Sequence, residues 1–318
     1  MVRAHVLIAA ALLGCGGGGG RGAAEPRGAE AAALPFQVLR ARGGQVVSWD
    51  AFIAELAAAD AVCIGENHPN PHDHWAQWKI VGAVSERTRG AGRSPGLGME
   101  MFQRTFQGVL DDFGARRIDE AALLSRSAWK DRWGYDWSLY RPIVLLARER
   151  GTAMLALNTE RELTKKVSRQ GIGKMSAADR AKLPELVLDD PQHRSWWDAI
   201  MGGMGGAHGH SDEEGDAPED KPDPEAEAAG ERIYAAQVLW DETMADGASK
   251  WLAAGPKRHI VILAGNGHCH ESAIVRRLER RGVKSAVSVH PIVDDGKGNV
   301  AELLAEPEND YLFVMSAR

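Results

Sequence analysis

The sequence predicts an α/β fold with a mostly parallel central sheet, flanking helices and a helical or mobile lid insertion. Short apolar runs typical of strands alternate along the chain with longer segments whose apolar residues recur at helical spacing. Apolar residues make up 44% of the 318 residues, which is enough for a packed core. The stretch 202–230 is different, because it is rich in glycine and acidic residues and has few side chains to bury.

Six strands and six helices are expected in a regular order. We expect strands at 61–65, 96–101, 152–157, 260–265, 285–289 and 312–315, and helices at 75–89, 104–113, 138–150, 161–170, 233–253 and 271–282. The repeated order of strand, helix and strand favours parallel pairing, since parallel strands need a crossover connection. A tryptophan-rich segment at 129–137 interrupts this order, and we expect it over one end of the sheet.

Residues 1–14 are predicted to be a signal peptide. A short basic start is followed by an apolar run at 6–13, which stops just before Cys15. As a helix this run would rise only about 12 Å, against the roughly 30 Å hydrocarbon core of a bilayer. It is therefore expected to be a transient export signal and not a membrane span.

The sequence Leu-Leu-Gly-Cys at 12–15 resembles the lipobox of bacterial lipoproteins. That resemblance implies that Cys15 is acylated, with palmitate among its acyl chains, and becomes the membrane anchor. The glycines of 15–33 predict a flexible tether, which precedes a domain at 34–318. Gly16, rather than an aspartate, follows Cys15, so we expect the outer membrane, facing the periplasm or the exterior. An ordinary secretory signal with a chance cysteine is the alternative.

Charge is unevenly distributed and argues against nucleic acid as a partner. Residues 212–231 hold ten acidic residues and one lysine, whereas the whole chain has a net charge of −6. Neither this part nor the remainder has the clustered lysines and arginines that nucleic-acid binding requires. The insertion at 202–230 is interpreted as a solvated loop, or as a lid in which His208 and His210 collect metal ions weakly. A homodimer is compatible with the sequence.

The two cysteines after the signal, Cys63 and Cys269, are not expected to form a disulfide. If Gly65 and Gly265 lie level in adjacent strands, the two sulfurs are about six residues apart along the strand direction, or roughly 20 Å. Cys269 is then either a soft metal ligand or, as we favour, a small residue at the start of a helix.

Polar side chains follow two of the expected strands in the same pattern, Gly-x-x-His. Glu66 and His68 follow one strand, and Asn266 and His268 follow the other. The carboxyl ends of parallel strands meet at one edge of a sheet, where ligand sites of open α/β folds lie. Glu100, at the end of a third strand, is expected at the same edge. Histidine and glutamate together serve as metal ligands or as general acid and base, although helix capping would also explain them.

Further motifs occur in order around these strand ends. They are Gly65-Glu66-Asn67-His68 with His74, Gly98-Met99-Glu100-Met101-Phe102, Trp133-Gly134-Tyr135 with Tyr140-Arg141-Pro142, Leu157-Asn158, Ala-Gln-x-x-Trp-Asp-x-x-Met-Ala at 236–245, and Gly265-Asn266-Gly267-His268. Together they resemble the ChaN family of haem-binding, iron-regulated lipoproteins, over roughly 61–281. Its wider superfamily includes Tiki metalloproteases, TraB-type proteins and erythromycin-esterase-like folds. The insertion and the Cys269-His270 ending depart from the family pattern.

The resemblance implies a protein that binds haem or iron for uptake. Haem needs aromatic or aliphatic walls, an iron ligand and a cation for its propionates. The candidate cofactor-binding residues are Trp133, Tyr135, Tyr140, Arg141 and Asn266, although tryptophans in this segment could equally fill the core.

Two alternatives to haem binding stay open. The first is a Tiki-like, metal-dependent hydrolase that holds zinc or another divalent metal through His68, His268, Glu66 and Glu100, with Glu66 or Glu100 as the catalytic base. The second is an envelope scaffold without enzymatic activity, in which the histidines only cap helices.

Overall fold

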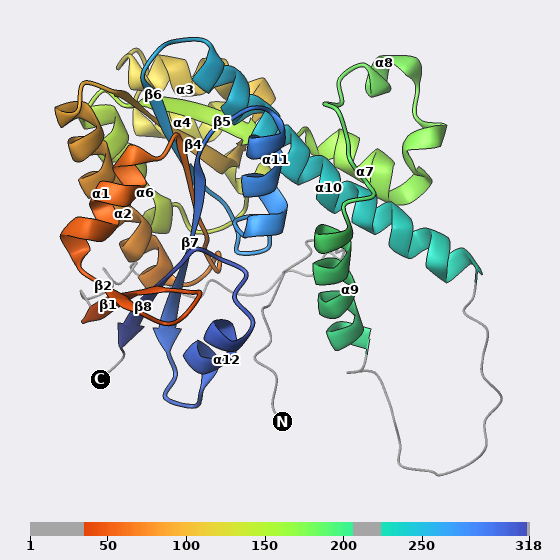
Figure 1. Cartoon of the computed structure of the whole chain (residues 1–318). Helices are drawn as coiled ribbons and strands as arrows, with labels where there is room; N and C mark the ends of the chain where they lie inside the picture. Colours follow the sequence, from red (N-terminus) through yellow and green to blue (C-terminus); the bar gives the residue numbers. More distant parts are fainter. Residues whose placement is uncertain (1–34, 206–223, 317–318) are drawn as a thin grey trace, which may run out of the picture.

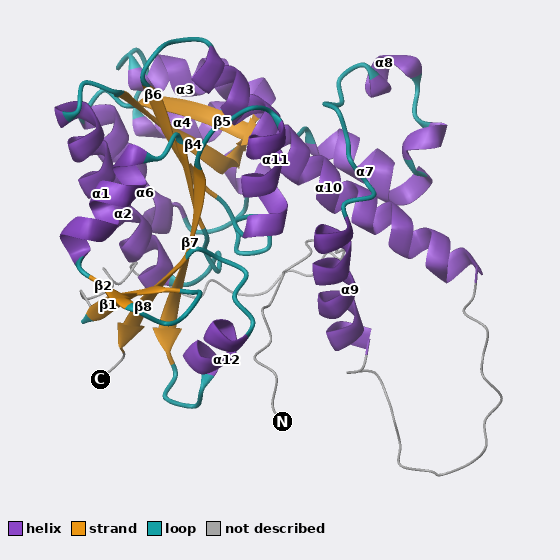
Figure 2. Ribbon diagram, in the orientation of Figure 1, coloured by secondary structure: helices purple, strands orange, loops and turns teal. Residues whose placement is uncertain are grey.

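The computed structural model describes residues 35–205 and 224–316, which form an eight-stranded sheet covered by helices on both faces (Figures 1 and 2). The strand order is β2(Val46–Val47), β1(Phe36–Arg40), β8(Tyr311–Ser316), β7(Ala286–Asp294), β3(Ala61–Ile64), β6(Arg258–Leu263), β4(Ser94–Gln103) and β5(Ala153–Asn158). Strand β1 pairs antiparallel with both of its neighbours, whereas all the other pairs are parallel. The sheet is therefore mixed but mostly parallel, as predicted in its larger part.

Two layers of helices cover the sheet. One layer contains α1(Trp49–Ala58), α2(Pro71–Gly90) and α6(Trp137–Glu149), and the other contains α10(Pro224–Ala253), a π-helix at Glu271–Val275 and α11(Arg276–Arg280). The remaining helices are η1(Arg104–Phe106), α3(Gln107–Gly114), α4(Glu120–Arg126), α5(Trp129–Arg132), α7(Arg161–Gln170), η2(Ile172–Lys174), α8(Ala177–Arg180), α9(Pro191–Gly205) and α12(Asn299–Ala305). Figure 1 shows α7, α8 and α9 grouped around α10 beside the sheet.

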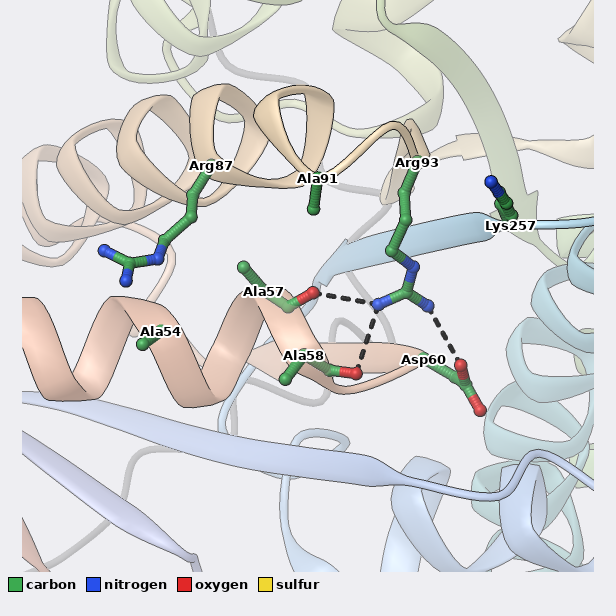
Figure 3. A pocket seen from close by; sticks show the side chains of 8 residues that line it. All are labelled: Ala54, Ala57, Ala58, Asp60, Arg87, Ala91, Arg93 and Lys257. Atoms are coloured by element: carbon green, nitrogen blue, oxygen red, sulfur yellow. Dashed lines mark hydrogen bonds and ion pairs between the residues drawn. The ribbon is translucent and has the colours of Figure 1, made fainter.

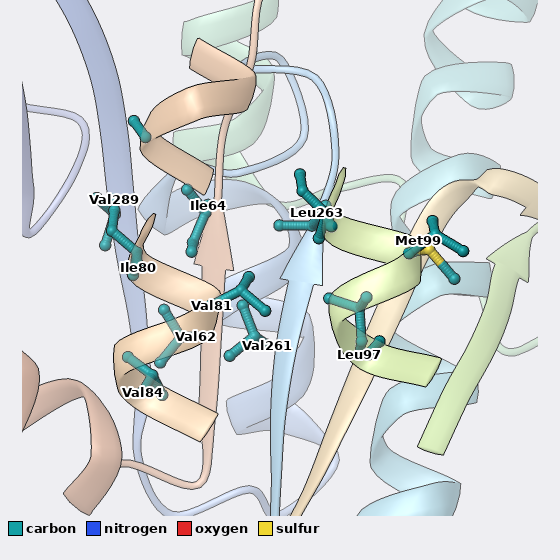
Figure 4. Packing of buried hydrophobic residues seen from close by; sticks show 14 of the residues in the cluster. Val62, Ile64, Ile80, Val81, Val84, Leu97, Met99, Val261, Leu263 and Val289 are labelled. Carbon is teal, nitrogen blue, oxygen red and sulfur yellow. The ribbon is translucent and has the colours of Figure 1, made fainter. Parts of the chain in front are cut away.

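Alternating side chains of the central strands build a separate core under each layer. In β3, Val62 and Ile64 belong to the cluster under α2, whereas Ala61 and Cys63 belong to the cluster under α10. Figure 4 shows α2 packed over the first of these cores. Because successive residues of a strand point to opposite faces, a strand buried on both sides is apolar throughout.

The six predicted strands are present, with boundaries that differ by a few residues. The helix predicted at 161–170 coincides with α7. The pair β1–β2 and helix α1 were not predicted. Strand β1 is held mainly by its pairing with β8, a partner far away in the sequence, so no local pattern indicates it.

The stretch 202–230, predicted to be a mobile insertion, is helical at both ends. Helix α9 extends to Gly205 and α10 begins at Pro224. Its middle part, the signal peptide, the tether and Cys15 lie outside the described residues. No helix in the described ranges is long and apolar enough to cross a bilayer.

The expectation that Cys63 and Cys269 stay apart is wrong, because they form a disulfide with their Cα atoms 5.2 Å apart. The prediction assumed that the chain continues straight beyond β6. Instead it turns at Gly265, whose carbonyl accepts hydrogen bonds from the amides of His268 and Cys269 at 2.8 and 3.3 Å. The turn brings Cys269 back to the side of the sheet on which Cys63 lies.

We predict that stability falls in mild acid because buried histidines are held neutral. Burial lowers the pKa of His259 to about 4, although its Nε2 donates to the carbonyl of Leu56 at 3.0 Å. Burial also lowers the pKa of His270 to about 3. Below pH 6.5 the unfolded chain gains protons that the folded chain does not, so the free energy of unfolding falls as the pH drops toward 4.

For His259 alone this loss is about 3 kcal/mol. The variant His259→Gln keeps a donor for the carbonyl of Leu56 but cannot titrate. Urea unfolding at several pH values should therefore show a shallower acid loss for the variant. Parallel curves for the two proteins would contradict this prediction.

Candidate functional site

The carboxyl ends of β3, β6 and β4 lie side by side. Ile64 at the end of β3 is level with Leu263 of β6, which is level in turn with Met99 of β4. The two Gly-x-x-His segments therefore follow parallel strands that end at the same edge of the sheet, as predicted, and the structure shows these strands to be adjacent. Glu100, near the end of β4, lies at the same edge. Strand β4 neighbours β6 and not β3.

His68 is held by a buried carboxylate. Its Nδ1 donates to Oε1 of Glu66 at 2.7 Å. Tyr140 donates to the same oxygen at 2.8 Å, and Gln77 donates to Oε2 at 2.9 Å. Glu66 therefore has its oxygens occupied and orients the imidazole of His68.

The charges of this pair stabilise each other. Burial alone would raise the pKa of Glu66, but the neighbouring His74 and the hydrogen bond from His68 outweigh it and keep the pKa below its ordinary value. Burial would lower the pKa of His68, yet the hydrogen bond to Glu66 and the charge of Glu100 raise it overall. Glu66 is thus an anion at neutral pH.

His268 lies close to two carboxylates, those of Asp241 and Glu100. Its Nδ1 lies 2.6 Å from Oδ1 of Asp241, and its Nε2 lies 3.5 Å from Oε1 of Glu100. Gln237 also contacts Nδ1 at 3.1 Å and donates to the carbonyl of Gly267. Burial lowers the pKa of His268, but Glu100 and Asp241 raise it overall. Both histidines are therefore paired through Nδ1 with a carboxylate.

The glycines of both motifs allow close approach of neighbouring groups. A Cβ atom at Gly65 would lie 2.0 Å from Oδ1 of Asn266. A Cβ atom at Gly265 would lie 3.1 Å from the ring of His68 and 3.8 Å from Oε2 of Glu100. That oxygen accepts the amide of Gly265 at 2.8 Å. Gly265 is consequently the point at which His68 and Glu100 come together.

Aromatic rings contact both His68 and His268. The ring centroids of Trp133 and Tyr135 lie 4.8 and 4.9 Å from that of His68. Trp240 lies 6.0 Å from His268 on the other side. By contrast, Trp129 is buried in the core. The tryptophan-rich segment therefore contributes both to the core and to the site.

The structure brings together most of the predicted site residues but not all. Tyr140 is buried beneath the site and reaches it through Glu66. Arg141 is directed elsewhere, because its guanidinium donates to both oxygens of Glu120 at 2.7 and 2.9 Å.

A buried charge network lies below His268 and was not predicted as a unit. Nε2 of His193 and Nη1 of Arg277 lie 3.1 and 3.7 Å from Oδ2 of Asp241. Arg277 also lies 3.4 Å from Glu242. Burial alone would raise the pKa of Asp241, but Arg277 and the hydrogen bonds of both histidines lower it strongly. Asp241 could be recognised from the sequence because it shares a helix face with Gln237. No local pattern indicates a role for His193.

Within residues 35–205 and 224–316, no group of three or more His, Cys, Asp or Glu side chains is arranged to hold a metal ion. The zinc site predicted at His68, His268, Glu66 and Glu100 is therefore unsupported. The physical reason lies in the carboxylates: both oxygens of Glu66 accept hydrogen bonds from side chains, and Oε2 of Glu100 accepts the amide of Gly265.

A cavity of about 500 Å³ lies at the opposite edge of the sheet (Figure 3). It is lined in part by Asp60, Arg93 and Lys257, which precede β3, β4 and β6. Arg93 donates to the carbonyls of Ala57 and Ala58 and to Asp60, so its charge stabilises the end of α1. Arg93, the most buried cation of this cavity, therefore has a structural role.

A model of the family described as "Haem-binding uptake, Tiki superfamily, ChaN" matches residues 52–278. Among solved structures, the chain is similar to ChaN of Campylobacter jejuni, described with cofacial haem binding, at a TM-score of 0.65 and 17% identity over 89% of this chain and 97% of that one. An open-form mutant of the erythromycin esterase EreC is similar at a TM-score of 0.44 and 14% identity, over 89% and 83%. The type III effector HopBA1 is similar at 0.42 and 11%, over 85% and 93%. No curated protein matched.

Proposed function

Because the chain belongs to the ChaN family of haem-binding uptake proteins in the Tiki superfamily, we propose that it binds haem at the carboxyl edge of its sheet. The observation that carries this proposal is the setting of His68. Its Nδ1 is held by Glu66, and its ring contacts those of Trp133 and Tyr135, which also contact each other. Among the described residues Nε2 has no hydrogen-bond partner, so it is free to ligate iron.

The residues present fit a porphyrin. An apolar plate requires aromatic contact surface, which Trp133 and Tyr135 supply. Iron accepts imidazole or phenolate, so His68 and Tyr135 are the two candidate ligands. The two arginines of this segment, Arg132 and Arg141, are each paired with a glutamate, at 2.5 and 2.7 Å. Asn266 lies on the neighbouring loop, where its amide donates to the carbonyl of Glu66 at 2.9 Å.

A hemin titration of the purified protein tests this function. We expect a Soret band that saturates at a fixed ratio of hemin to protein. Absence of saturation, or the same spectrum with an unrelated protein, would refute haem binding.

We further propose that the protein is exported and anchored by lipid on Cys15, in the outer membrane and in support of haem or iron uptake. The buried Cys63–Cys269 disulfide supports export, since disulfides persist in oxidising compartments such as the periplasm. The tether would then place the domain near the membrane surface.

Replacing Cys15 with serine should release the protein from membranes, because acylation is the only anchor proposed. Fractionation of cells that express the wild type and Cys15→Ser measures this directly. Gly16→Ala, which keeps the cysteine, serves as the control. If Cys15→Ser still pellets with membranes, the anchor lies elsewhere.

A further inference from the structure

We propose that the Cys63–Cys269 disulfide is a positioning clamp that holds the two histidine loops at the separation needed for ligand binding. Its effect on the ligand rests on the proposed function, whereas its effect on the loops does not. Cys63 lies two residues before Gly65, and Cys269 directly follows His268. One covalent bond therefore joins the chain beside both Gly-x-x-His segments.

The two loops pack against each other at Gly65 and Gly265, but few backbone hydrogen bonds join them among the described residues. The regular β3–β6 ladder ends at Ile64 and Leu263. Beyond it, the amide of Ala264 donates to Ile64 at a long 3.4 Å, and the amide of Asn266 donates to Glu66 at 2.9 Å. Strand pairing alone would therefore leave the loops free to move apart after the strands end.

The chain after His268 is irregular, which increases the need for a clamp. Ala273, inside the π-helix, has a backbone conformation outside the helical region. The carbonyl of Cys269 accepts a bond from Asn309 at 2.6 Å, and Asp241 holds the ring of His268. Asp241 thus orients the imidazole, while the disulfide fixes the backbone that carries it relative to β3.

The disulfide is enclosed, which suits a permanent clamp. Both cysteines are only 1% exposed and pack with Ile262 and Ile274 in the core under α10. Because thiol exchange requires access of a thiolate to a sulfur, the bond is protected while the domain stays folded. It joins two cysteines with a sequence separation of 206 residues.

The test compares the double variant Cys63→Ala/Cys269→Ala with Ile260→Ala. Ile260 lies in the same core cluster but is level with Ala61 at the other end of β3. Its truncation therefore destabilises the same core without touching the clamp. Unfolding by urea confirms that both variants fold, and non-reducing peptide mapping confirms the disulfide in the wild type.

Hydrogen exchange without ligand is the first readout. We expect the amides of Asn266 and His268 to exchange at least tenfold faster in the double cysteine variant, and at nearly the wild-type rate in Ile260→Ala. Hemin affinity is the second readout, and we expect a loss of at least tenfold in the double variant only.

Unchanged exchange at these amides, or equal acceleration in both variants, would overturn the clamp. So would peptide mapping that finds Cys63 and Cys269 unlinked in exported protein. If the wild type bound no hemin, the proposed function would fail, but the exchange comparison would still decide whether the disulfide positions the loops.

Discussion

Replacing His68 with alanine is expected to abolish measurable hemin binding, with a loss of affinity greater than about a hundredfold. Loss of a residue that only orients a metal ligand typically costs about 10–100-fold in affinity, and loss of the ligand itself costs more. In the part of the chain that the structure describes, Nε2 of His68 has no hydrogen-bond partner, and Glu66 fixes the orientation of the ring. The fold should survive, because His68 is partly exposed beside the aromatic rings.

The matched control is His72→Ala, a half-buried histidine in the first turn of α2. It should bind hemin as the wild type does. Tyr135→Phe separates the two candidate ligands, since it removes the phenol but keeps the ring. If His68→Ala retained wild-type affinity while Tyr135→Phe lost binding, Tyr135 would be the ligand and His68 would not.

Replacing Arg277 with methionine is expected to cause a large loss of stability, about 3–5 kcal/mol. Arg277 is 1% exposed and lies beside Asp241 and Glu242, both of them fully buried. Methionine fills much of the space but carries no charge. In the variant, Asp241 would keep its histidine partners, and Glu242 would keep its pairs with Arg280 and Arg281. Stability falls because these remaining partners do not fully balance the two buried negative charges.

The loss should depend on pH in a definite direction. The pKa of Asp241 is depressed in the folded protein, so its charge contributes stability above the pKa of the unfolded chain, and that contribution is lost as the pH falls. The difference between wild type and Arg277→Met should therefore be largest near neutral pH and shrink in acid. Urea unfolding of both proteins near neutral pH and in acid measures this difference.

The control for this prediction is the same substitution at the surface. Arg117 pairs with Asp112 at 2.8 Å but is 59% exposed, so Arg117→Met should cost less than about 1 kcal/mol. Similar losses for the two variants would show that the buried charges below His268 are not coupled to Arg277.

The parts of the fold that follow from local patterns could be predicted from the sequence. Strands such as β3 and β6 are apolar throughout because helices cover both faces of the sheet. A continuous apolar run can be recognised within one segment of the sequence. The convergence of His68 and His268 followed as well, since the carboxyl ends of parallel strands share one edge. Membership of the ChaN family was likewise indicated by motifs that can be read in order along the chain.

Only the tertiary structure decided the features that depend on where the chain goes after a strand ends. The disulfide was excluded on the assumption of a straight continuation, and the turn at Gly265 reverses that conclusion. The partners of His268 and the pairing of Arg141 with Glu120 likewise join residues that are distant in sequence or lie on separate helices. Local periodicity determines which face of an element is buried, but side-chain partners depend on the packing of several elements at once, which no single segment encodes.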